Sequence, residues 1–295
     1  MNFSLGVQRE LPWGLFVEAN GVGNLGRNLT RQIDLNAAPL ALQLANPGVN
    51  TALLRPYKGF TGILQRVSDA SSHYYAMQFY GGKRKGNVLA TISYTWSKVL
   101  SDANVLTEQA EEGLYNRAFN FGPAIFDRRH VFVATYTYSL PFFRKTTGWV
   151  KTVLDGYEIS GITRIQAGKP YTITGAASIG GTRRADIVND TIDLYIRDNR
   201  QWLNPAAFAA APGSRLGTSG VGIVTGPILA VNDFSVRKRF RLGEKKDLRL
   251  QADVFNAFNR NNFSNMQTVV TNASFGTLTV SGPGRSIQLG IKFGF

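Results

Sequence analysis

The sequence predicts an all-β protein whose antiparallel strands form a transmembrane barrel. Apolar and polar residues alternate through segments of about ten residues, and short turns alternate with long connections along the chain. Strands of soluble proteins are usually about 5–6 residues long, whereas strands that cross a bilayer need about 9–11 residues. The 295-residue chain carries 33 Lys and Arg against 19 Asp and Glu. It contains no cysteine, which excludes a disulfide framework and a thiolate metal site.

Alternation is clearest in five segments. These are residues 3–8, 88–97, 131–140, 248–254 and 286–295. In the last segment, Ile287, Leu289 and Ile291 lie on one side of a predicted strand, and Gln288 and Lys292 lie on the other. In a membrane barrel the apolar side faces lipid and the polar side faces the lumen. A soluble sandwich would bury the apolar side instead, and alternation alone does not separate the two.

Four aromatic residues near strand ends indicate where the membrane surfaces lie. Tyr94 and Trp96 end one predicted strand, and Tyr136 and Tyr138 end another, all on the apolar side. Girdles of aromatic residues at both interfaces are typical of membrane barrels. We therefore predict that these four residues form an aromatic girdle, which favours the membrane over the soluble sandwich.

The connections between predicted strands fall into two classes. Tight turns are expected at residues 11–14, 81–86 and 142–148. Long connections are expected at about 23–58, 98–126 and 175–230, and two shorter external loops at 68–72 and 242–247. If the C-terminus is periplasmic, the tight turns face the periplasm and the long connections lie outside the cell. The best candidate helix lies within one long connection, between Asp102 and Leu114.

The alternation predicts about thirteen membrane crossings, two of them weak. A closed antiparallel barrel needs an even number of strands. The weak crossings fall near residues 28–36 and between 190 and 220. By this count the first and last crossings run in the same direction. Residues 1–295 are therefore expected to form a single partial barrel domain, without a plug or a signal peptide, unless the count is wrong by one.

Basic residues are spread along the chain and form no single stripe, which disfavours a nucleic-acid partner. The densest run is RKRFR at 237–241, where alternate residues share one face of a strand. The possible lumen charges are Arg237, Arg239, Arg249 and Lys292. Arginines facing a lumen would favour anionic solutes or pair with a plug. The alternative is an external rim at which Lys238 extends its ammonium group to water.

The remaining motifs are explained better by structural roles than by nucleotide binding, metal binding or catalysis. GVGNLG (21–26) matches the spacing of a dinucleotide-binding loop, but no helical pattern follows it, so a glycine-rich strand end is expected. His73 and His130 have no second histidine at metal-ligand spacing, and we expect each at a strand edge. Three carboxylates on a polar loop are expected to be solvated: Glu108, Glu111 and Glu112. We predict no catalytic, cofactor-binding or metal site.

Several segments, taken together and in order, resemble a known family. They are FDRRHVFVATYTYSLPF (126–142), GYEISGITRIQAGKPYTIT (156–174), LNPAAF (203–208), GPILAVNDFSVRKRFRL (226–242), LQADVFNAFNRNNF (250–263) and SFGTLTVSGPGRSIQLGIKFGF (274–295). SHYYAMQFY and ATISYTWSK resemble the same family. The family is the Oar-like group of TonB-dependent outer-membrane receptors, whose members often carry a carboxypeptidase-regulatory-like domain, and the segments are similar to its C-terminal barrel.

The resemblance implies a barrel of about 22 strands with a plug inside it. It also implies a TonB box that contacts an inner-membrane energy-transducing complex. Ile291, Phe293 and Phe295 are then a signal read by the barrel assembly machinery. The sequence departs from the family because plug, TonB box, regulatory domain and signal peptide are not visible. We therefore expect a truncated or split gene product that lacks the plug and the N-terminal barrel half.

Three functional hypotheses remain open from the sequence. The first is a barrel segment of a TonB-dependent receptor that takes up a large solute across the outer membrane of a Gram-negative type bacterium, in contact with outer-membrane lipid. The second is a self-contained passive pore of about twelve strands. The third is a soluble basic β-protein that binds polyanions.

Overall fold

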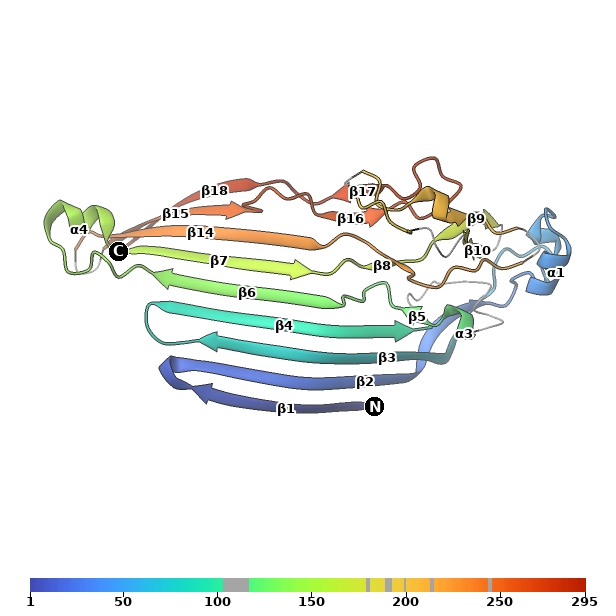
Figure 1. Cartoon of the computed structure of the whole chain (residues 1–295), viewed down its shortest axis with the longest axis horizontal. Helices are drawn as coiled ribbons and strands as arrows, with labels where there is room; N and C mark the ends of the chain where they lie inside the picture. Colours follow the sequence, from blue (N-terminus) through green and yellow to red (C-terminus); the bar gives the residue numbers. More distant parts are fainter. Residues whose placement is uncertain (103–116, 179–180, 189–192, 199, 213–214, 244–245) are drawn as a thin grey trace.

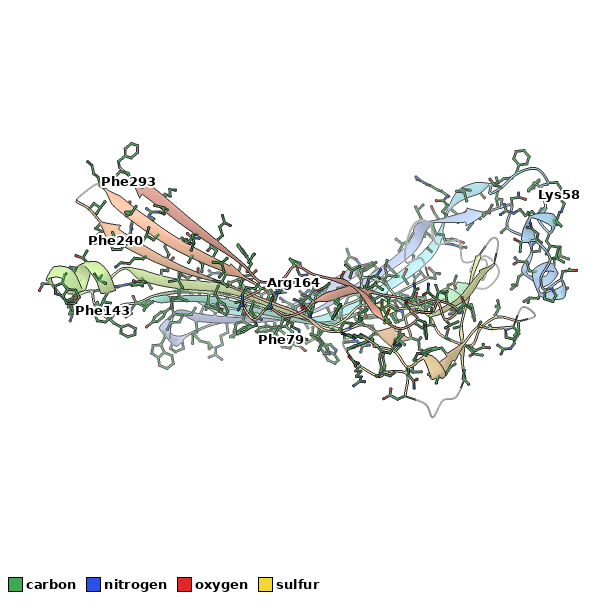
Figure 2. The ribbon with its side chains drawn as sticks, turned by 90° about the horizontal axis from the view of Figure 1, so that it is seen from above. Lys58, Phe79, Phe143, Arg164, Phe240 and Phe293 are labelled. Atoms are coloured by element: carbon green, nitrogen blue, oxygen red, sulfur yellow. The ribbon has the colours of Figure 1, made fainter. Side chains whose placement is uncertain are left out.

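A long, twisted antiparallel sheet of ten strands is the main feature of the computed structural model (Figures 1 and 2). The structure describes residues 1–102, 117–178, 181–188, 193–198, 200–212, 215–243 and 246–295. In sheet order, the main strands are β1 (Asn2–Leu11), β2 (Leu15–Asp34), β3 (Leu64–Lys83), β4 (Val88–Ser101), β6 (His130–Ser139), β7 (Tyr157–Gln166), β14 (Leu229–Arg241), β15 (Asp247–Phe255) and β18 (Ser286–Gly294). The short strand β5 (Gly122–Pro123) pairs with β4.

Each main strand pairs antiparallel with the next one along the sheet. The prediction of an all-β antiparallel fold is therefore confirmed. Nine strands lie on this path, so β1 and β18 run in the same direction, as the sequence predicts for the first and last crossings. The outer edges of β1 and β18 have no strand beside them among the described residues.

The sheet has fewer long strands than the predicted count of about thirteen crossings. Residues 28–34, expected to belong to a separate weak crossing, are the end of β2, which is 20 residues long. The described part of 190–220 forms only short elements. The SDASS segment at 68–72, predicted as an external loop, lies inside β3. Its small polar residues look like a turn, but they pair with β2, and the Arg31 Nε atom donates to the Asp69 Oδ1 atom at 2.7 Å.

The two ends of the sheet differ, and we call them the turn end and the loop end. The turn end carries the 3-10 helix η1 (Pro12–Gly14) between β1 and β2, the β3–β4 turn, and the C-terminus (Figure 1). The hairpin of β14 and β15 also turns there, since Arg241 pairs with Asp247 and Asp247 pairs with Gly294. The prediction of residues 242–247 as an external loop is therefore wrong, because β15 pairs directly with β18 and so begins at the same end of the sheet as the C-terminus. The β6–β7 connection, predicted as a tight turn, instead carries helix α4 (Gly148–Leu154).

The register sorts side chains onto two faces. The apolar face carries Leu5, Val7, Met77, Phe79, Ile92, Phe132, Ile159, Phe234, Val236, Leu250, Ile287, Leu289 and Ile291. The polar face carries Gln8, Asn20, Gln78, Ser93, Thr95, Thr135, Ser160, Arg237, Arg239, Arg249, Gln251, Gln288 and Lys292. Large apolar side chains are exposed on the first face; Leu289, for example, is 78% exposed. A sheet in water would cover such a row, whereas lipid solvates it.

The main packed core lies at the loop end, outside the long sheet. Four small antiparallel sheets form there: β8 (Pro170–Tyr171) with β13 (Val224–Thr225), β9 (Thr174–Ser178) with β10 (Gly181–Arg184), β11 (Asp186–Ile187) with β12 (Phe208–Ala209), and β16 (Phe263–Met266) with β17 (Leu278–Ser281). We call the described residues of 168–226 and 263–281 the loop body. Its buried core contains Ile173, Ala185, Leu203, Ala207, Phe208, Val224, Met266 and Phe275.

The remaining helices are short. They are α1 (Leu40–Ala45), η2 (Thr51–Leu53), α3 (Arg117–Asn120) and η3 (Pro205–Ala207). None of the helices in the described ranges has the length and apolar character needed to cross a bilayer. The helix predicted between Asp102 and Leu114 falls almost entirely on 103–116, outside the described residues.

Candidate functional site

The four predicted girdle residues lie on the apolar face in two separate groups. Trp96 pairs with His130 and Tyr94 with Phe132, toward the loop end, and the Tyr94 hydroxyl lies 2.9 Å from the His130 Nδ1 atom. Tyr136 and Tyr138 lie toward the turn end. Trp96 and the partner of Tyr138, which is Val88, are eight positions apart in β4, or about 27 Å at the usual rise of a strand. This separation matches an apolar band about 25 Å tall between two girdles.

Strand β18 and the residue that follows it carry the predicted assembly signal. Ile291 pairs with Leu250 and Phe293 with Leu248 on the apolar face. The rings of Phe293 and Phe295 stack with their centroids 6.2 Å apart, and Phe295 is 94% exposed. The signal residues thus form one row at the turn end of the strand, and their role in assembly stays a prediction.

The structure brings the four predicted lumen charges together on the polar face at the turn end. Arg239 pairs with Arg249, and Arg249 pairs with Lys292, so three cations form a row across β14, β15 and β18. Like charges directly opposite each other in a sheet are destabilising. The Asp247 carboxylate offsets part of this repulsion, because its Oδ2 atom lies 3.2 Å from the Arg239 Nε atom and 2.5 Å from the Arg249 Nε atom. Arg237 lies on the same face, two residue pairs further from the turn end than this row.

Arg237 has two partners of its own. Its Nη1 atom lies 2.8 Å from the Glu158 Oε1 atom on β7, and its Nε atom donates to the Gln251 Oε1 atom on β15 at 3.2 Å. Gln251 in turn donates to the Asp253 carboxylate. Sequence analysis missed these acceptors, because their approach depends on strand register. The only available signal was their alternation on the polar side of each strand.

Lys238 occupies an exceptional position on the apolar face. It is only 6% exposed, and its ammonium group donates to the Asp155 carbonyl. The same ammonium lies 4.8 Å from the ring centroids of both Tyr157 and Phe240, within the range of cation–π attraction. Lys238 therefore extends along the sheet toward the turn end, but its ammonium group is buried there, whereas the external-rim alternative expects it to reach water.

A polar pocket of about 710 Å³ lies at the turn end between the β6–β7 connection and the β14–β15 hairpin. The connection contributes Arg144, Lys151 and Asp155, and β7 contributes Glu158. The hairpin contributes Arg237, Lys238, Arg239, Arg241 and Arg249. Seven cationic side chains thus line the pocket with two carboxylates. Sequence analysis missed Arg144 and Lys151, since a tight turn was expected at that point.

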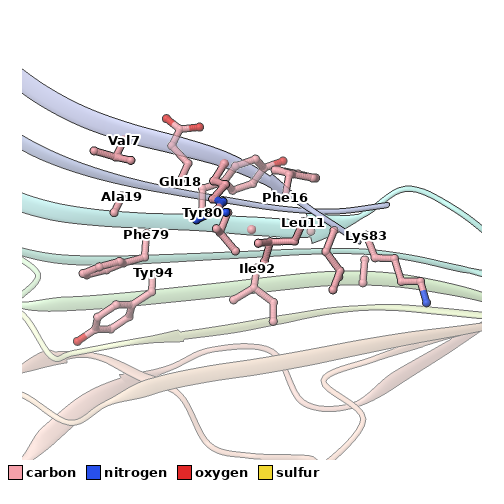
Figure 3. Close-up of a pocket in the computed structure, with 16 residues that line it drawn as sticks. Val7, Leu11, Phe16, Glu18, Ala19, Phe79, Tyr80, Lys83, Ile92 and Tyr94 are labelled. Atoms are coloured by element: carbon pink, nitrogen blue, oxygen red, sulfur yellow. The ribbon is translucent and has the colours of Figure 1, made fainter. Parts of the chain in front are cut away.

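An apolar groove of about 710 Å³ lies near the turn end of strands β1 to β4 (Figure 3). Val7 and Leu11 from β1, Phe79 from β3, and Ile92 and Tyr94 from β4 line it. All five belong to the apolar face by register. The groove has the chemistry to hold acyl chains of lipid, and it offers few groups that could orient a polar ligand.

The loop body is held by polar contacts as well as by its core. Arg215 donates two hydrogen bonds of 2.7 Å to the Asp186 carboxylate, which lowers the pKa of Asp186. The Thr218 backbone N–H also donates to Asp186, at 3.0 Å. Burial raises the pKa of Tyr171 to about 12, and the Lys169 ammonium lies 4.8 Å from the centre of its ring. These contacts give the loop body a defined shape.

The remaining sequence motifs have structural positions wherever they fall within the described residues. GVGNLG (21–26) lies inside β2, paired with β3 throughout and with β1 over residues 21–24, so it is a glycine-rich strand segment but its expected place at a strand end is wrong. His130 begins β6, but His73 lies inside β3, so the strand-edge expectation is wrong for His73. Glu108, Glu111 and Glu112 lie outside the described residues. The described ranges contain no group of three or more potential metal ligands.

A scan against family models matches residues 1–288 to the outer membrane beta barrel domain. The chain belongs to this family. Its place is therefore the outer membrane of a Gram-negative bacterium, and the predicted fold class and localisation are confirmed. The soluble polyanion-binding alternative is wrong, because membership of this family assigns the exposed apolar face to lipid.

Solved structures of outer-membrane proteins share the fold. The chain is similar to the outer membrane transporter YddB from Escherichia coli, with a TM-score of 0.52 and 11% identity, over 100% of this chain and 32% of that one. It is also similar to the ferripyoverdine receptor of Pseudomonas aeruginosa, with a TM-score of 0.51 and 10% identity, over 100% and 27% of the two chains. The chain thus spans about a third or less of the proteins it matches. No curated protein sequence matches it.

Proposed function

We propose that the chain is a wall segment of a TonB-dependent, Oar-like outer-membrane receptor that takes up a large solute. The observation that carries the proposal is the open sheet of nine antiparallel main strands whose first and last members run in the same direction. An odd number of strands cannot close on itself with antiparallel pairs throughout. In this proposal further strands, a plug and the TonB complex complete the receptor.

Both faces of the sheet support this assignment. The apolar face has the chemistry of a lipid-facing wall with two aromatic girdles. The polar face carries paired charges near the turn end, including Arg237 with Glu158 and Arg249 with Asp247, as a wet or plugged lumen requires. With the turn end toward the periplasm, the loop body lies outside the cell, where a receptor meets its solute. The proposal gives the chain a transport role and no enzymatic role.

The proposal can be tested first on DNA and then on protein. We expect an in-frame region upstream of Met1, or a neighbouring gene, to encode a plug and an odd number of further strands. The purified chain alone should give no discrete conductance steps in planar bilayers, since its sheet is open. Stable single-channel steps from the chain alone would support a self-contained passive pore and contradict the proposal.

A further inference from the structure

The polar pocket at the turn end contains more positive charge than its neighbours neutralise. Its lining holds seven cationic side chains and two carboxylates. The adjacent Asp247 carboxylate, shared between Arg239 and Arg249, brings the acidic groups to three. An excess of four positive charges therefore remains within the described part of the pocket. Concentrated like charge of this kind is costly unless an anion resides nearby.

The cations converge from parts of the chain that are distant in sequence. Arg144 and Lys151 come from the β6–β7 connection, which places α4 beside the hairpin of β14 and β15. Arg237 and Arg239 come from β14, and Arg249 comes from β15. Among the described residues, no ion pair engages Arg144 or Lys151. Two cations therefore remain available on one wall, opposite the partly neutralised arginines of the sheet.

We propose that this pocket binds a compact polyanion that bears phosphate or carboxylate groups. The volume of about 710 Å³ lies within the range of small-molecule sites, about 300–1,000 Å³. Guanidinium groups bind phosphate and carboxylate through paired hydrogen bonds, and lysine adds a point charge. The inference rests on the proposed function, because Arg237, Arg239 and Arg249 of the lining are on the polar face, which the proposed function turns toward the lumen near the periplasmic mouth.

The test uses the full chain in detergent micelles, with pyrophosphate and citrate as probes and calorimetry as the readout. We expect saturable binding that weakens as salt rises, because the contacts are ionic. The double variant Arg144→Gln with Lys151→Gln should weaken binding by about ten-fold or more. Both residues lie outside the strands, so the sheet should form normally in this variant. The preference between the two probes identifies phosphate or carboxylate as the recognised group.

Lys145→Gln is the matched control, because Lys145 is the neighbour of Arg144 and does not line the pocket. It should leave the affinity within about two-fold, since it removes charge but no lining group. The absence of saturable binding, or an equal loss in the control, would overturn the proposal. Tighter binding of a polyglutamate peptide than of either probe would also overturn it in favour of an acidic protein segment.

The outcomes separate this inference from the proposed function. If the chain assembles into a receptor barrel in membranes but neither probe saturates it, the polyanion pocket fails and the receptor assignment stands. If the probes bind as expected but the chain alone forms discrete pores, the pocket stands and the receptor assignment fails.

Discussion

Phe295 ends the apolar row of β18 with an exposed ring that stacks on Phe293. Removing it deletes the last aromatic group at the turn end without breaking a strand pair, since β18 ends at Gly294. In a full-length receptor that carries this tail, we expect deletion of Phe295 to reduce the assembled, heat-modifiable fraction in outer membranes. Phe295→Tyr should retain assembly because it keeps an aromatic ring. Unchanged assembly after the deletion would show that Phe295 is no assembly signal.

The contact between Asp186 and Arg215 should make the stability of the loop body depend on pH. Arg215 holds the pKa of Asp186 below its ordinary value, so the stabilisation is complete above the unfolded pKa of about 3.9 and is lost as pH falls through the folded pKa. We expect hydrogen exchange of the 186–187 and 208–209 amides to quicken as pH falls from about 5 to 3, after correction for intrinsic rates.

Asp186→Asn isolates this contribution from the other carboxylates. The variant should exchange faster than the wild type at pH 6 and should show a smaller additional change below pH 4. Identical pH profiles for the two proteins would mean that the contact with Arg215 contributes no stability.

Substitutions in strand β18 can test which face of the sheet contacts lipid. Leu289 points from the apolar face near the middle of the strand, and its neighbour Gln288 points from the polar face. Leu289→Lys should destabilise the membrane-inserted protein by about 2–4 kcal/mol if the residue lies at the bilayer midplane. Gln288→Lys, with the same added charge, should cost much less. Denaturant titration in lipid vesicles measures both, and equal costs would contradict the assigned faces.

Alternation predicted the most regular strands and the side of their residues, because the two-residue period of a strand is local. It placed Arg237, Arg239, Arg249 and Lys292 on one face correctly. Which of them are neighbours depends on register, and the sequence does not encode register locally. Register also explains the failure at 68–72, where small polar residues inside β3 are stabilised by pairing with β2.

The pocket and the loop body depended on tertiary contacts that no local pattern reveals. Helix α4 appears where a tight turn was expected, and it supplies Lys151 to the polar pocket. The core of the loop body joins Leu203 to Phe275 across more than seventy residues, in segments that lack a strong period. Local sequence predicts only that these segments are long connections.

The direction of the edge strands constrains how the whole molecule assembles. Two copies inserted with the same orientation would place β18 of one beside β1 of the other, and these strands would run parallel. Antiparallel pairing is the rule in bacterial outer-membrane barrels. We therefore expect that a homodimer does not close the wall, and that an odd-stranded partner does.

Because the chain has no cysteine, pairs of introduced cysteines can report contacts without disulfides from native thiols. Leu5→Cys with Leu289→Cys places one thiol on each edge strand, and oxidised membranes should show no disulfide-linked dimer specific to this pair. Val254→Cys with Ile287→Cys is the positive control, because the two residues are direct partners in β15 and β18. A dimer found only with the edge pair would establish a head-to-tail homodimer.

The loop body has a practical consequence for engineering. Its core draws on two connections, one between β7 and β14 and the other between β15 and β18, and a bridge joins Gln201 to Thr277. Neither connection can be grafted onto another barrel by itself, since each would expose the apolar half that the other covers. A chimera should transplant both segments together, with the four strands that hold their ends at the correct spacing.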